Sequence, residues 1–532
     1  MRASDERGVR TVIRARDLGE HLPFQTDGDC EIEADYAVVG SGAGGAAAAL
    51  TLARAGYRVA LCESGAWREP ADYPSSFFGA LRDLCADWGT LFSRGRSLIP
   101  VLQGNCVGGT TVINSAIMVR LPGDVLAEWQ ELGLGDVFGE GAFDRVQDEI
   151  EEELGVEPMA GPQLGTSGEL MLAALRKLKM EGHAMRRAAP GCEGRGQCLQ
   201  GCSAGRKSSL NLQWVPETLS RGGALLSEAR VERVRIKDGR ALGVSGHFRR
   251  VGARREQPRK GSRFVIHTKR GVLLAASSTG TAPLLQRSGY RHAALGRNFM
   301  AQPGAGILGV YPDAVHMERG TTQGVASMQL RESHGVKLES LSIPLEILAA
   351  RVAGAGVGHA DLLERYPHMA MWAAAVRAEA RGTIRPSPLG PSAPPTLRYE
   401  PTRGDTQRLR AGILELARLH FAAGAQQVLP GVHGLPTRIG PDQLDLLAAA
   451  PLDNRCWTWV LTHLFGGCVM GADKRHAVVG TDLCVRGVDA LHVVDASCLP
   501  TTLGVNPQLT IMSVARLVAE RLANETTNRS TG

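Results

Sequence analysis

The residues of this sequence whose types and spacing can carry chemistry are a histidine, an asparagine and two glycine-rich segments. His463 stands in "WVLTHLFGGCVMG" between an apolar run and two consecutive glycines, and Asn506 follows in "GVNPQLTI". An imidazole changes its charge near neutral pH and is therefore suited to accept the proton of a hydroxyl group. By itself, His463 is also compatible with a packed core residue or a metal ligand. His492, in the strand-like "ALHVVD", is expected to pack structurally.

The first glycine-rich segment, "VVGSGAGG", places Gly40, Gly42 and Gly45 in a G-x-G-x-x-G pattern between an apolar strand and a small-residue helix. The first glycine permits a tight turn, the second lets a pyrophosphate approach the backbone, and the third allows close helix–strand packing. The helix N-terminus favours the pyrophosphate, and Glu63, which ends the next strand, can accept hydrogen bonds from a ribose. A second copy of the pattern, residues 304–309, lacks this strand–turn–helix context. The first copy predicts a site for FAD or NAD.

The second glycine-rich segment is "QGNCVGGTTVINSAIMVR", residues 103–120. Gly108 and Gly109 permit close approach of the backbone, and Asn114 can hydrogen-bond the polar edge of a ring. An NAD-dependent dehydrogenase has no need of such a segment, whereas a flat isoalloxazine ring needs a glycine-lined contact. A structural glycine turn is the alternative.

Three segments, in the same order, resemble the glucose–methanol–choline (GMC) flavoprotein oxidoreductases: the first glycine pattern, "GGTTVIN", and "THLFGGCVMG" followed by "GVNPQLTI". The last segment looks most like the cholesterol oxidase and long-chain alcohol oxidase branches. The resemblance implies FAD, bound covalently or non-covalently, and oxidation of an alcohol CH–OH to a carbonyl by hydride transfer to flavin N5. It implies His463 as the base and Asn506 as the group that orients the oxygen. It also suggests an apolar substrate: a long-chain, sterol-like or otherwise bulky alcohol.

The resemblance also implies contacts with the cofactor. Asp495, at the end of "HVVD", would contact the pyrophosphate–ribityl region, and Ser277 stands on the adenine side where glycine is usual. A glutamate from the substrate domain assists in the cholesterol oxidase branch, and Glu339 and Glu346 are its candidates here. In chain order, the implied cofactor contacts are Gly40, Gly42, Ala43, Gly45, Glu63, Gly108, Gly109, Asn114, Asp495, Asn506, Pro507 and Gln508.

The implied fold combines the α/β and α+β classes. It has a discontinuous Rossmann-like FAD-binding domain and a substrate domain built on an antiparallel sheet covered by helices. The expected segments are an N-terminal arm at 1–30, the FAD-binding domain at 31–125, 203–302 and 455–532, and the substrate domain at 126–202 and 303–454.

Local patterns predict further elements. Residues 138–183 predict helices, and 224–248 predict strands joined by a turn at "KDG". The Pro-rich stretch 383–404 predicts extended strands and turns, and an amphipathic helix follows it. A terminal helix is predicted over about Thr510–Ala523. The Lys- and Arg-rich segment 249–270 predicts a solvated hairpin or loop.

Length and composition limit the class of function. With 532 residues, 43% hydrophobic and 21% charged, the sequence predicts a globular protein of two or three domains. The net charge of +6 is small for this length and disfavours nucleic-acid binding, and no apolar run is long enough for a membrane span. Eleven cysteines without a secretory signal favour reduced thiols and a cytoplasmic location. The expected partners are a small-molecule alcohol and O2 or another electron acceptor; the sequence does not determine the oligomeric state.

Cys192, Cys198 and Cys202 form a cysteine cluster shortly before Lys207. This segment resembles one in related alcohol oxidases and cholesterol oxidase, and the resemblance implies a loop near the flavin. A zinc or iron–sulfur site usually has four protein ligands, and the C-x5-C-x3-C spacing matches no common site, so no metal is expected. Lys207 is expected near the cofactor or backbone carbonyl groups. Two alternatives to alcohol oxidation are a non-redox lyase of the same flavoprotein fold, which would still use His463, and an electron-transfer flavoprotein with a metal cluster.

Overall fold

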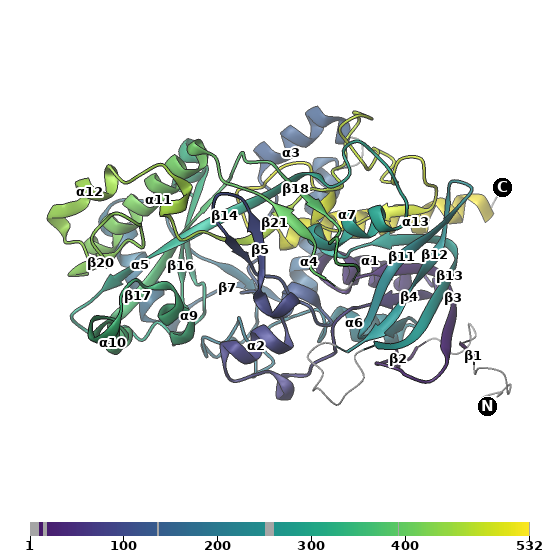
Figure 1. The fold of residues 1–532 in the computed structure, drawn as a ribbon, viewed down its shortest axis with the longest axis horizontal. Helices are drawn as coiled ribbons and strands as arrows, with labels where there is room; N and C mark the ends of the chain where they lie inside the picture. Colours follow the sequence, from purple (N-terminus) through teal and green to yellow (C-terminus); the bar gives the residue numbers. More distant parts are fainter. Residues whose placement is uncertain (1–9, 14–18, 136–137, 251–259, 392, 531–532) are drawn as a thin grey trace.

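The chain folds into two large β-sheets with helices packed on and between them. The structure, a computed structural model, describes residues 10–13, 19–135, 138–250, 260–391 and 393–530. Among these residues, one sheet has nine strands and lies toward one end of the molecule (Figure 1). The other has eleven strands and extends to the opposite end of the molecule. The mixed α/β and α+β class expected from the sequence is confirmed.

The nine-stranded sheet has a parallel centre whose strands end along one edge. Val39 at the end of β3 pairs in register with Cys62 on β4 and with Leu274 on β13, and Leu274 pairs with Val493 on β22. Ligands of such sheets bind beyond the carboxyl ends of the strands. In pairing order the strands are β11 (Ala229–Lys237), β12 (Arg240–Arg249), β13 (Lys260–Leu274), β3 (Asp29–Val39), β4 (Val59–Cys62), β10 (Ala224–Leu226) and β2 (His21–Leu22), with β1 (Arg10–Ile13) on β3 and β22 (Leu491–Val493) on β13.

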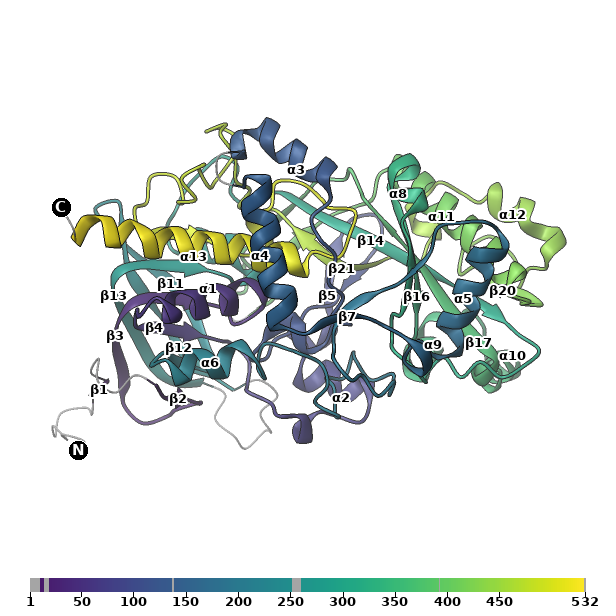
Figure 2. The ribbon, with the colours of Figure 1, turned by 180° about the vertical axis from the view of Figure 1, so that it is seen from behind.

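The packing of helix α1 (Ala43–Arg54) explains why its sequence is so rich in alanine. The helix packs on β3, β4 and β13, and against α6 (Trp214–Ser220) and α13 (Gln508–Ser530) (Figure 2). Nearly all of its residues are buried, and small side chains let the sheet and both helices approach closely. The predicted β–α–β unit is confirmed as β3, α1 and β4, with Gly56 just after the helix at a φ of +84°.

The eleven-stranded sheet is mostly antiparallel, and α11 (Arg403–Ala422) packs on its strands β14, β16 and β17, as the amphipathic pattern predicted. Strands β5, β6 and β21 come from segments assigned by sequence to the FAD-binding domain, yet they pair with this sheet. In pairing order the strands are β18 (Gly382–Arg385), β19 (Thr396–Arg398), β5 (Leu91–Arg94), β6 (Ile99–Val101), β21 (Val460–Phe465), β14 (Arg297–Val310), β17 (Met369–Val376), β16 (Val336–Leu341), β15 (Val325–Ser327) and β8 (His183–Ala184), with β20 (Gln427–Leu429) on β14.

The remaining helices surround the two sheets, and β7 (Val156–Pro158) pairs with β9 (Arg186–Ala188) as a separate ribbon. No helix within the described ranges is long and apolar enough to cross a membrane. The remaining α-helices are α2 (Phe77–Asp83), α3 (Gly123–Trp129), α4 (Glu140–Glu153), α5 (Gly165–Lys177), α7 (Ser277–Arg287), α8 (Gln329–His334), α9 (Leu345–Arg351), α10 (Gly356–Glu364) and α12 (Leu444–Ala448).

Most local predictions are confirmed. Helices α4 and α5 occupy the helical segment, strands β10, β11 and β12 occupy the strand segment, and β18 and β19 overlap the Pro-rich stretch. The repeated G-x-G-x-x-G pattern lies within strand β14, outside any strand–turn–helix unit. The terminal helix α13 begins at Gln508, two residues before the predicted start, and runs to Ser530.

Two segments expected to be polar and peripheral contribute strands to the nine-stranded sheet. Of the expected N-terminal arm, β1 and β2 pair with β3 and β10, while residues 1–9 and 14–18 lie outside the described residues. In the basic segment, residues 251–259 also lie outside them. The predicted hairpin is confirmed, since β12 and β13 pair antiparallel on either side of these residues. Its solvation is wrong for the first part of β13: Phe264 and Ile266 are fully buried because β13 also pairs with β3 in the sheet centre.

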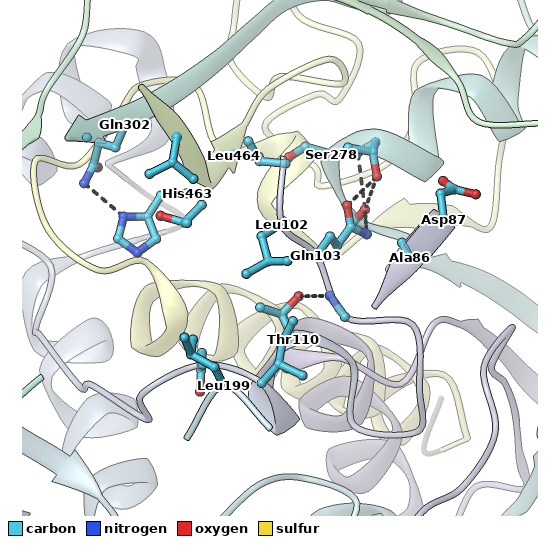
Figure 3. Close-up of a pocket in the computed structure, with 18 of the residues that line it drawn as sticks. Ala86, Asp87, Leu102, Gln103, Thr110, Leu199, Ser278, Gln302, His463 and Leu464 are labelled. Atoms are coloured by element: carbon cyan, nitrogen blue, oxygen red, sulfur yellow. Dashed lines mark hydrogen bonds between the residues drawn. The ribbon is translucent and has the colours of Figure 1, made fainter. Parts of the chain in front are cut away.

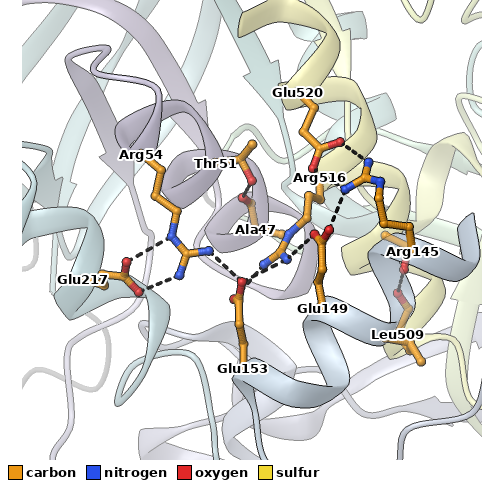
Figure 4. Close-up of polar contacts among 11 residues, drawn as sticks. Ala47, Thr51, Arg54, Arg145, Glu149, Glu153, Glu217, Leu509, Arg516 and Glu520 are labelled. Atoms are coloured by element: carbon orange, nitrogen blue, oxygen red, sulfur yellow. Dashed lines mark hydrogen bonds and ion pairs between the residues drawn. The ribbon is translucent and has the colours of Figure 1, made fainter. Parts of the chain in front are cut away.

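A chain of ion pairs joins the helices α1, α4, α6 and α13 (Figure 4). Glu153 on α4 accepts hydrogen bonds from Arg516 Nη2 on α13 at 2.8 Å and from Arg54 Nη1 on α1 at 2.7 Å. Arg54 also forms a two-pronged contact with Glu217 on α6 at 3.0 and 2.9 Å. The side chain of Arg516 is only 4% exposed, and Glu153 is its nearest carboxylate, while Glu149 Oε2 lies farther away, at 3.5 Å from Nη1.

Replacing Glu153 with alanine should destabilise the fold. Arg516 would remain almost buried without its closest carboxylate, so Glu153→Ala is expected to lower the free energy of unfolding by roughly 2 kcal/mol. Glu149→Ala, one turn earlier on α4 with a side chain 42% exposed, is the matched control and should change it by less than about 1 kcal/mol. Denaturant unfolding of both variants measures the difference.

The pH dependence provides a second check. Burial raises the pKa of Glu153, but hydrogen bonds from Arg516 and Arg54 outweigh burial and hold this pKa below its ordinary value. The advantage of wild type over Glu153→Ala should therefore be full at neutral pH and shrink as the pH falls through that pKa. Equal losses in the two variants would contradict the special role of Glu153.

Candidate active site

A cavity of about 1120 Å³ lies between the carboxyl edge of the nine-stranded sheet and the eleven-stranded sheet. It is lined by the turns that follow β3, β4, β13 and β22, and by residues of β14, β17, β21 and α9. Its size lies above the usual range for a small-molecule site, so it has room for a large cofactor with a substrate.

The glycines of the first pattern differ in the atoms that a side chain at each position would meet. Gly40 has a φ of +100°, and a Cβ there would lie 2.2 Å from the carbonyl oxygen of Ala275. A Cβ at Gly45 would lie 1.8 Å from the carbonyl oxygen of Gly40, and one at Gly44 would lie 1.8 Å from that of Val494. All three must therefore lack a side chain for the turn and helix to pack. Gly40 and Gly44 also line the cavity, whereas Gly45 is not among the described lining residues.

Gly42 and Ala43 both line the cavity. A Cβ at Gly42 would meet only the Cα of Gly109, at 3.9 Å, so packing leaves open space there. Gly42 is the N-cap of α1 and provides no side-chain hydrogen bond to the first turn. A helix N-terminus without a side-chain cap retains N–H groups and a positive dipole end that suit a pyrophosphate. The residues present therefore fit the dinucleotide part of FAD.

Ser41 is a residue that sequence reasoning missed. Its N–H and its hydroxyl both donate to Glu63 Oε2, at 3.0 and 2.7 Å, and its Oγ accepts the N–H of Gly108 at 3.0 Å. The other carboxylate oxygen of Glu63 accepts the N–H of Gly65 at 2.9 Å. Ser41 thus joins both glycine-rich segments to the expected ribose-binding carboxylate. A serine inside a glycine pattern gives no sequence signal for such partners.

Asp495 lines the cavity but is held by the chain itself. Its carboxylate accepts hydrogen bonds from the N–H of Ser277 at 2.8 Å, the hydroxyl of Thr281 at 2.6 Å and the N–H of Ser497 at 2.8 Å. Burial raises the pKa of Asp495, and these hydrogen bonds oppose that rise. Ser277 adopts the left-handed φ of +73° that favours glycine; its bond to Asp495, and one from Gln103 Nε2 to its Oγ at 2.7 Å, hold the turn.

The expected flavin-side residues come together from distant parts of the chain. Asn114 donates to Gln508 at the start of α13, and Asn506, Pro507 and Gln508 all line the cavity. Gly109 also lines it, at the point where its backbone approaches Gly42. Gly108 lies behind this surface and is not among the described lining residues; a Cβ there would lie 2.8 Å from the backbone nitrogen of Asn211.

His463 and Asn506 lie side by side in the cavity. His463 is on β21, opposite Gln302 on β14, and its Nδ1 lies 3.5 Å from Gln302 Nε2 (Figure 3). On the other side of the ring, Nε2 lies 3.4 Å from Asn506 Nδ2. His492 lies elsewhere, buried in β22, with Nδ1 at 3.0 Å from the Leu483 carbonyl oxygen, and the prediction of structural packing is confirmed.

The orientation of both amides beside His463 is fixed by other partners. Gln302 accepts the N–H of Gly504 at 2.9 Å and donates to the Val505 carbonyl oxygen at 3.1 Å, so its NH2 group faces His463. Asn506 accepts at Oδ1 from the Lys337 ammonium, which can only donate, so its NH2 group also faces the ring.

Burial, together with these neighbours, keeps His463 uncharged. An imidazolium would present N–H groups toward two NH2 groups, which is unfavourable. Burial lowers the pKa of His463 to about 4; the Glu339 carboxylate opposes this shift and the Lys337 ammonium adds to it. This pKa lies below the near-neutral value expected of an imidazole from the sequence, because the ring is buried. At neutral pH the ring is therefore a neutral group able to accept a proton.

The two candidate glutamates occupy different places. Glu339 on β16 lines the cavity, but its Oε2 forms an ion pair with Lys337 Nζ at 2.9 Å and its Oε1 accepts from Gln323 at 2.8 Å. Glu346 on α9 faces the N–H of Phe77 at 3.4 Å and is not among the described lining residues. Lys337 and Gln302 are further residues that sequence reasoning missed, since nothing in a strand sequence indicates a partner 169 residues away.

The cysteine cluster lies beside the second glycine-rich segment. Lys207 Nζ donates to the carbonyl oxygens of Val112, of Asn114 at 2.9 Å and of Cys198 at 3.0 Å, which confirms its expected carbonyl contacts. Burial opposes ionisation of Cys198, but Arg187 and Lys207 outweigh it and lower the pKa of the thiol to about 7. No group of three or more metal-ligating side chains is found among the described residues.

The other end of the cavity is apolar. Side chains from the eleven-stranded sheet and α9, with Ile343 and Val352 from the segments next to α9, form this wall, which we call the apolar wall. These side chains belong to one hydrophobic cluster. The residues of the apolar wall are Leu308, Leu341, Ile343, Ile347, Leu348, Val352 and Met371.

Comparison with known proteins identifies related sequences over nearly the whole chain. The family described as GMC oxidoreductase matches residues 34–304 with its N-terminal part and residues 378–515 with its C-terminal part. An uncharacterized GMC-type oxidoreductase of Mycobacterium tuberculosis is 35% identical over 94% of this chain and 77% of that protein. A long-chain-alcohol oxidase of Arabidopsis thaliana is 28% identical over 99% of this chain and 70% of that protein.

Solved structures share the fold at low sequence identity. A formate oxidase of Aspergillus oryzae has a TM-score of 0.68 at 15% identity, covering 93% of this chain and 99% of that one. A pyridoxine 4-oxidase of Mesorbium loti has a TM-score of 0.64 at 16% identity, covering 92% and 98%. These likenesses support the overall arrangement of the two sheets.

Substitutions at two neighbouring glycines should separate folding from cofactor binding. Gly44→Ala puts a Cβ 1.8 Å from the Val494 carbonyl oxygen, so α1 must shift and the melting temperature of the apoprotein should fall by several degrees. Gly42→Ala meets only Gly109, at 3.9 Å, and should leave that temperature within about 2 °C. It should still weaken FAD binding by roughly tenfold, because the methyl group enters the cavity.

Apoprotein melting and FAD titration followed by flavin fluorescence measure the two effects. Normal FAD affinity in Gly42→Ala would show that this glycine does not face the cofactor.

Proposed function

Because this chain belongs to the GMC oxidoreductase family and is an FAD-dependent oxidoreductase acting on CH–OH donors, we propose that it oxidises an apolar alcohol with His463 as base. Asn506 holds the alcohol oxygen in this proposal. The observation that carries it is the pairing of His463 Nε2 and Asn506 Nδ2 at 3.4 Å in a cavity that also contains the α1 N-terminus. Bound FAD supplies a hydride acceptor at flavin N5.

The proposed chemistry begins with the hydroxyl group. An alcohol oxygen beside both side chains can pass its proton to His463 Nε2 and accept a hydrogen bond from the Asn506 NH2 group. A neutral ring is required for the first step, and the low pKa of His463 provides it. The donor of Asn506 is aimed where negative charge develops on oxygen, which favours loss of hydride from the adjacent carbon. Glu339 is paired with Lys337 and is therefore a poorer candidate for the base.

The apolar wall supports an apolar substrate. Burial of alkyl surface against such a wall is favourable by about 0.8 kcal/mol for each methylene group. The long-chain-alcohol oxidases of Arabidopsis thaliana, at 24–28% identity, are consistent with this class. We propose O2 or another electron acceptor for reoxidation. The non-redox lyase reading would give cleavage of a substrate without anaerobic bleaching of the flavin.

Removal of the imidazole should slow flavin reduction. His463→Ala is expected to lower the anaerobic rate of flavin bleaching by roughly 10²- to 10⁴-fold, while FAD content stays normal. His476→Ala, at an exposed histidine paired with Asp473, is the control and should retain the wild-type rate. Because the pKa of His463 is about 4, wild-type kcat/KM should remain high in mild acid and fall only as the pH approaches that value. A wild-type rate in His463→Ala would remove His463 from the reaction.

Chain length should determine the rate for primary alcohols. Each added methylene is expected to raise kcat/KM by roughly fourfold, from about 0.8 kcal/mol of apolar burial, until the apolar wall is covered. Ile347→Ser should reduce this dependence for long alcohols and leave the values for short ones unchanged, which provides an internal control. Steady-state kinetics with a homologous alcohol series measures the slope; a flat series would exclude the apolar class.

A further inference from the structure

Lys337 is a buried ammonium directly behind Asn506. It extends from β16, its side chain is 2% exposed, and it donates to Asn506 Oδ1 and to Glu339 Oε2, the latter at 2.9 Å. A buried charge is strongly unfavourable unless it is paired and hydrogen-bonded, and here the partners are one carboxylate and one amide oxygen. The ion pair is held in turn by Gln323, which donates to Glu339 Oε1 at 2.8 Å.

The contact with Lys337 determines which end of the Asn506 amide, Oδ1 or the NH2 group, is turned toward the cavity. A neutral imidazole with its proton on Nε2 could donate a hydrogen bond to Oδ1 of Asn506, so His463 alone does not fix the amide. An ammonium group has no acceptor, and it therefore selects the orientation with Oδ1 toward β16 and NH2 toward the cavity. Rotation of the amide would place two donors against each other at Lys337.

The same ammonium acts on His463 through its charge. From β16, the charged groups that affect His463 are Glu339 and Lys337, which act in opposite directions. From β14 and the residues before α13 come the neutral amides of Gln302 and Asn506. The ion pair therefore places a donor-only group behind Asn506 with little net charge beside the base.

We propose that Lys337 is a positioning residue of the alcohol-oxidation site, which holds the Asn506 amide with its NH2 group toward the substrate oxygen while Glu339 balances its charge. This inference rests on the proposed function and deepens it. In this role, Lys337 determines that Asn506 presents a hydrogen-bond donor, and not an acceptor, at the point where the alcohol oxygen acquires negative charge.

The decisive variant removes both charges together. In Lys337→Met/Glu339→Gln, His463 keeps a balanced charge environment, but Asn506 loses the group that orients it. We expect anaerobic flavin reduction of the holoenzyme to slow by roughly tenfold to hundredfold, with normal FAD content and an acid limb of the pH profile close to that of wild type. Lys337→Arg, which retains donors, should recover most of the rate. Lys177→Met, at a surface lysine that contacts the Ala422 carbonyl oxygen, is the control and should match wild type.

The single variant tests the charge. Lys337→Met leaves Glu339 unopposed, so the pKa of His463 should rise and the acid limb of kcat/KM should move to higher pH. Histidine NMR titration of the holoprotein, with the His463 resonance identified from His463→Ala, reads this shift without any substrate. If Lys337→Met is too unstable to purify, Glu339→Gln provides the opposite sign: the pKa of His463 should fall.

The outcomes separate this inference from the proposed function. A wild-type reduction rate in the double variant, or an unchanged His463 titration in the single variant, would overturn the role of Lys337. Failure of every alcohol to bleach the flavin, with the expected shift in the titration, would reject the alcohol reaction and uphold the coupling of Lys337 to His463. Slow reduction in the double variant, together with a rate in Lys337→Arg close to that of wild type, would support the positioning role. A loss of fold would be recognised because it would also lower FAD content.

Discussion

The close contact of α1 with the edge of the parallel sheet is the constraint on which the rest of the site depends. Gly45 lies against the Gly40 carbonyl and Gly44 against that of Val494, so no side chain fits at either position. This contact aligns the N-terminus of α1 with the ends of β3, β13 and β22. It also brings the Gly42 backbone to Gly109, and Ser41 ties that contact to Glu63. The cofactor surface is therefore a consequence of backbone packing more than of polar side chains.

The second consequence of this packing reaches the proposed catalytic pair. Helix α13 packs along α1, and Asn506 stands just before its first residue, Gln508. His463 comes instead from β21, whose register with β14 places it opposite Gln302. The pair is thus formed where an element anchored to the nucleotide-binding sheet meets a strand of the substrate-side sheet. A shift of either element by a fraction of an ångström would change the geometry at the alcohol oxygen.

The sequence predicts the parts of this site whose signal is local. Gly40, Gly42 and Gly45 carry their meaning in their spacing, and the β–α–β unit follows from apolar runs around them. The matched C-terminal segment identifies His463 and Asn506 only because a family resemblance exists. Sheet membership of β21 was not predictable, since a short apolar strand is compatible with either sheet. Lys337 was missed for the same reason: its neighbours in sequence indicate a strand, and its partner is brought near only by the fold.

The polar groups around His463 show how the proposed base can be kept neutral inside the cavity. A single carboxylate beside the ring would favour the imidazolium and hold the proton, whereas a single ammonium would make proton acceptance too costly. Glu339 and Lys337 occur as a pair, so most of their effect on the ring cancels, and what remains is the direction of the Asn506 amide. Gln302 supplies a second fixed amide from β14. Neutral amide dipoles thus orient the groups around the ring, and the paired charges of Lys337 and Glu339 hold the Asn506 amide in place. The ring remains able to accept a proton and to release it again, as the proposed oxidation of an alcohol requires in every turnover.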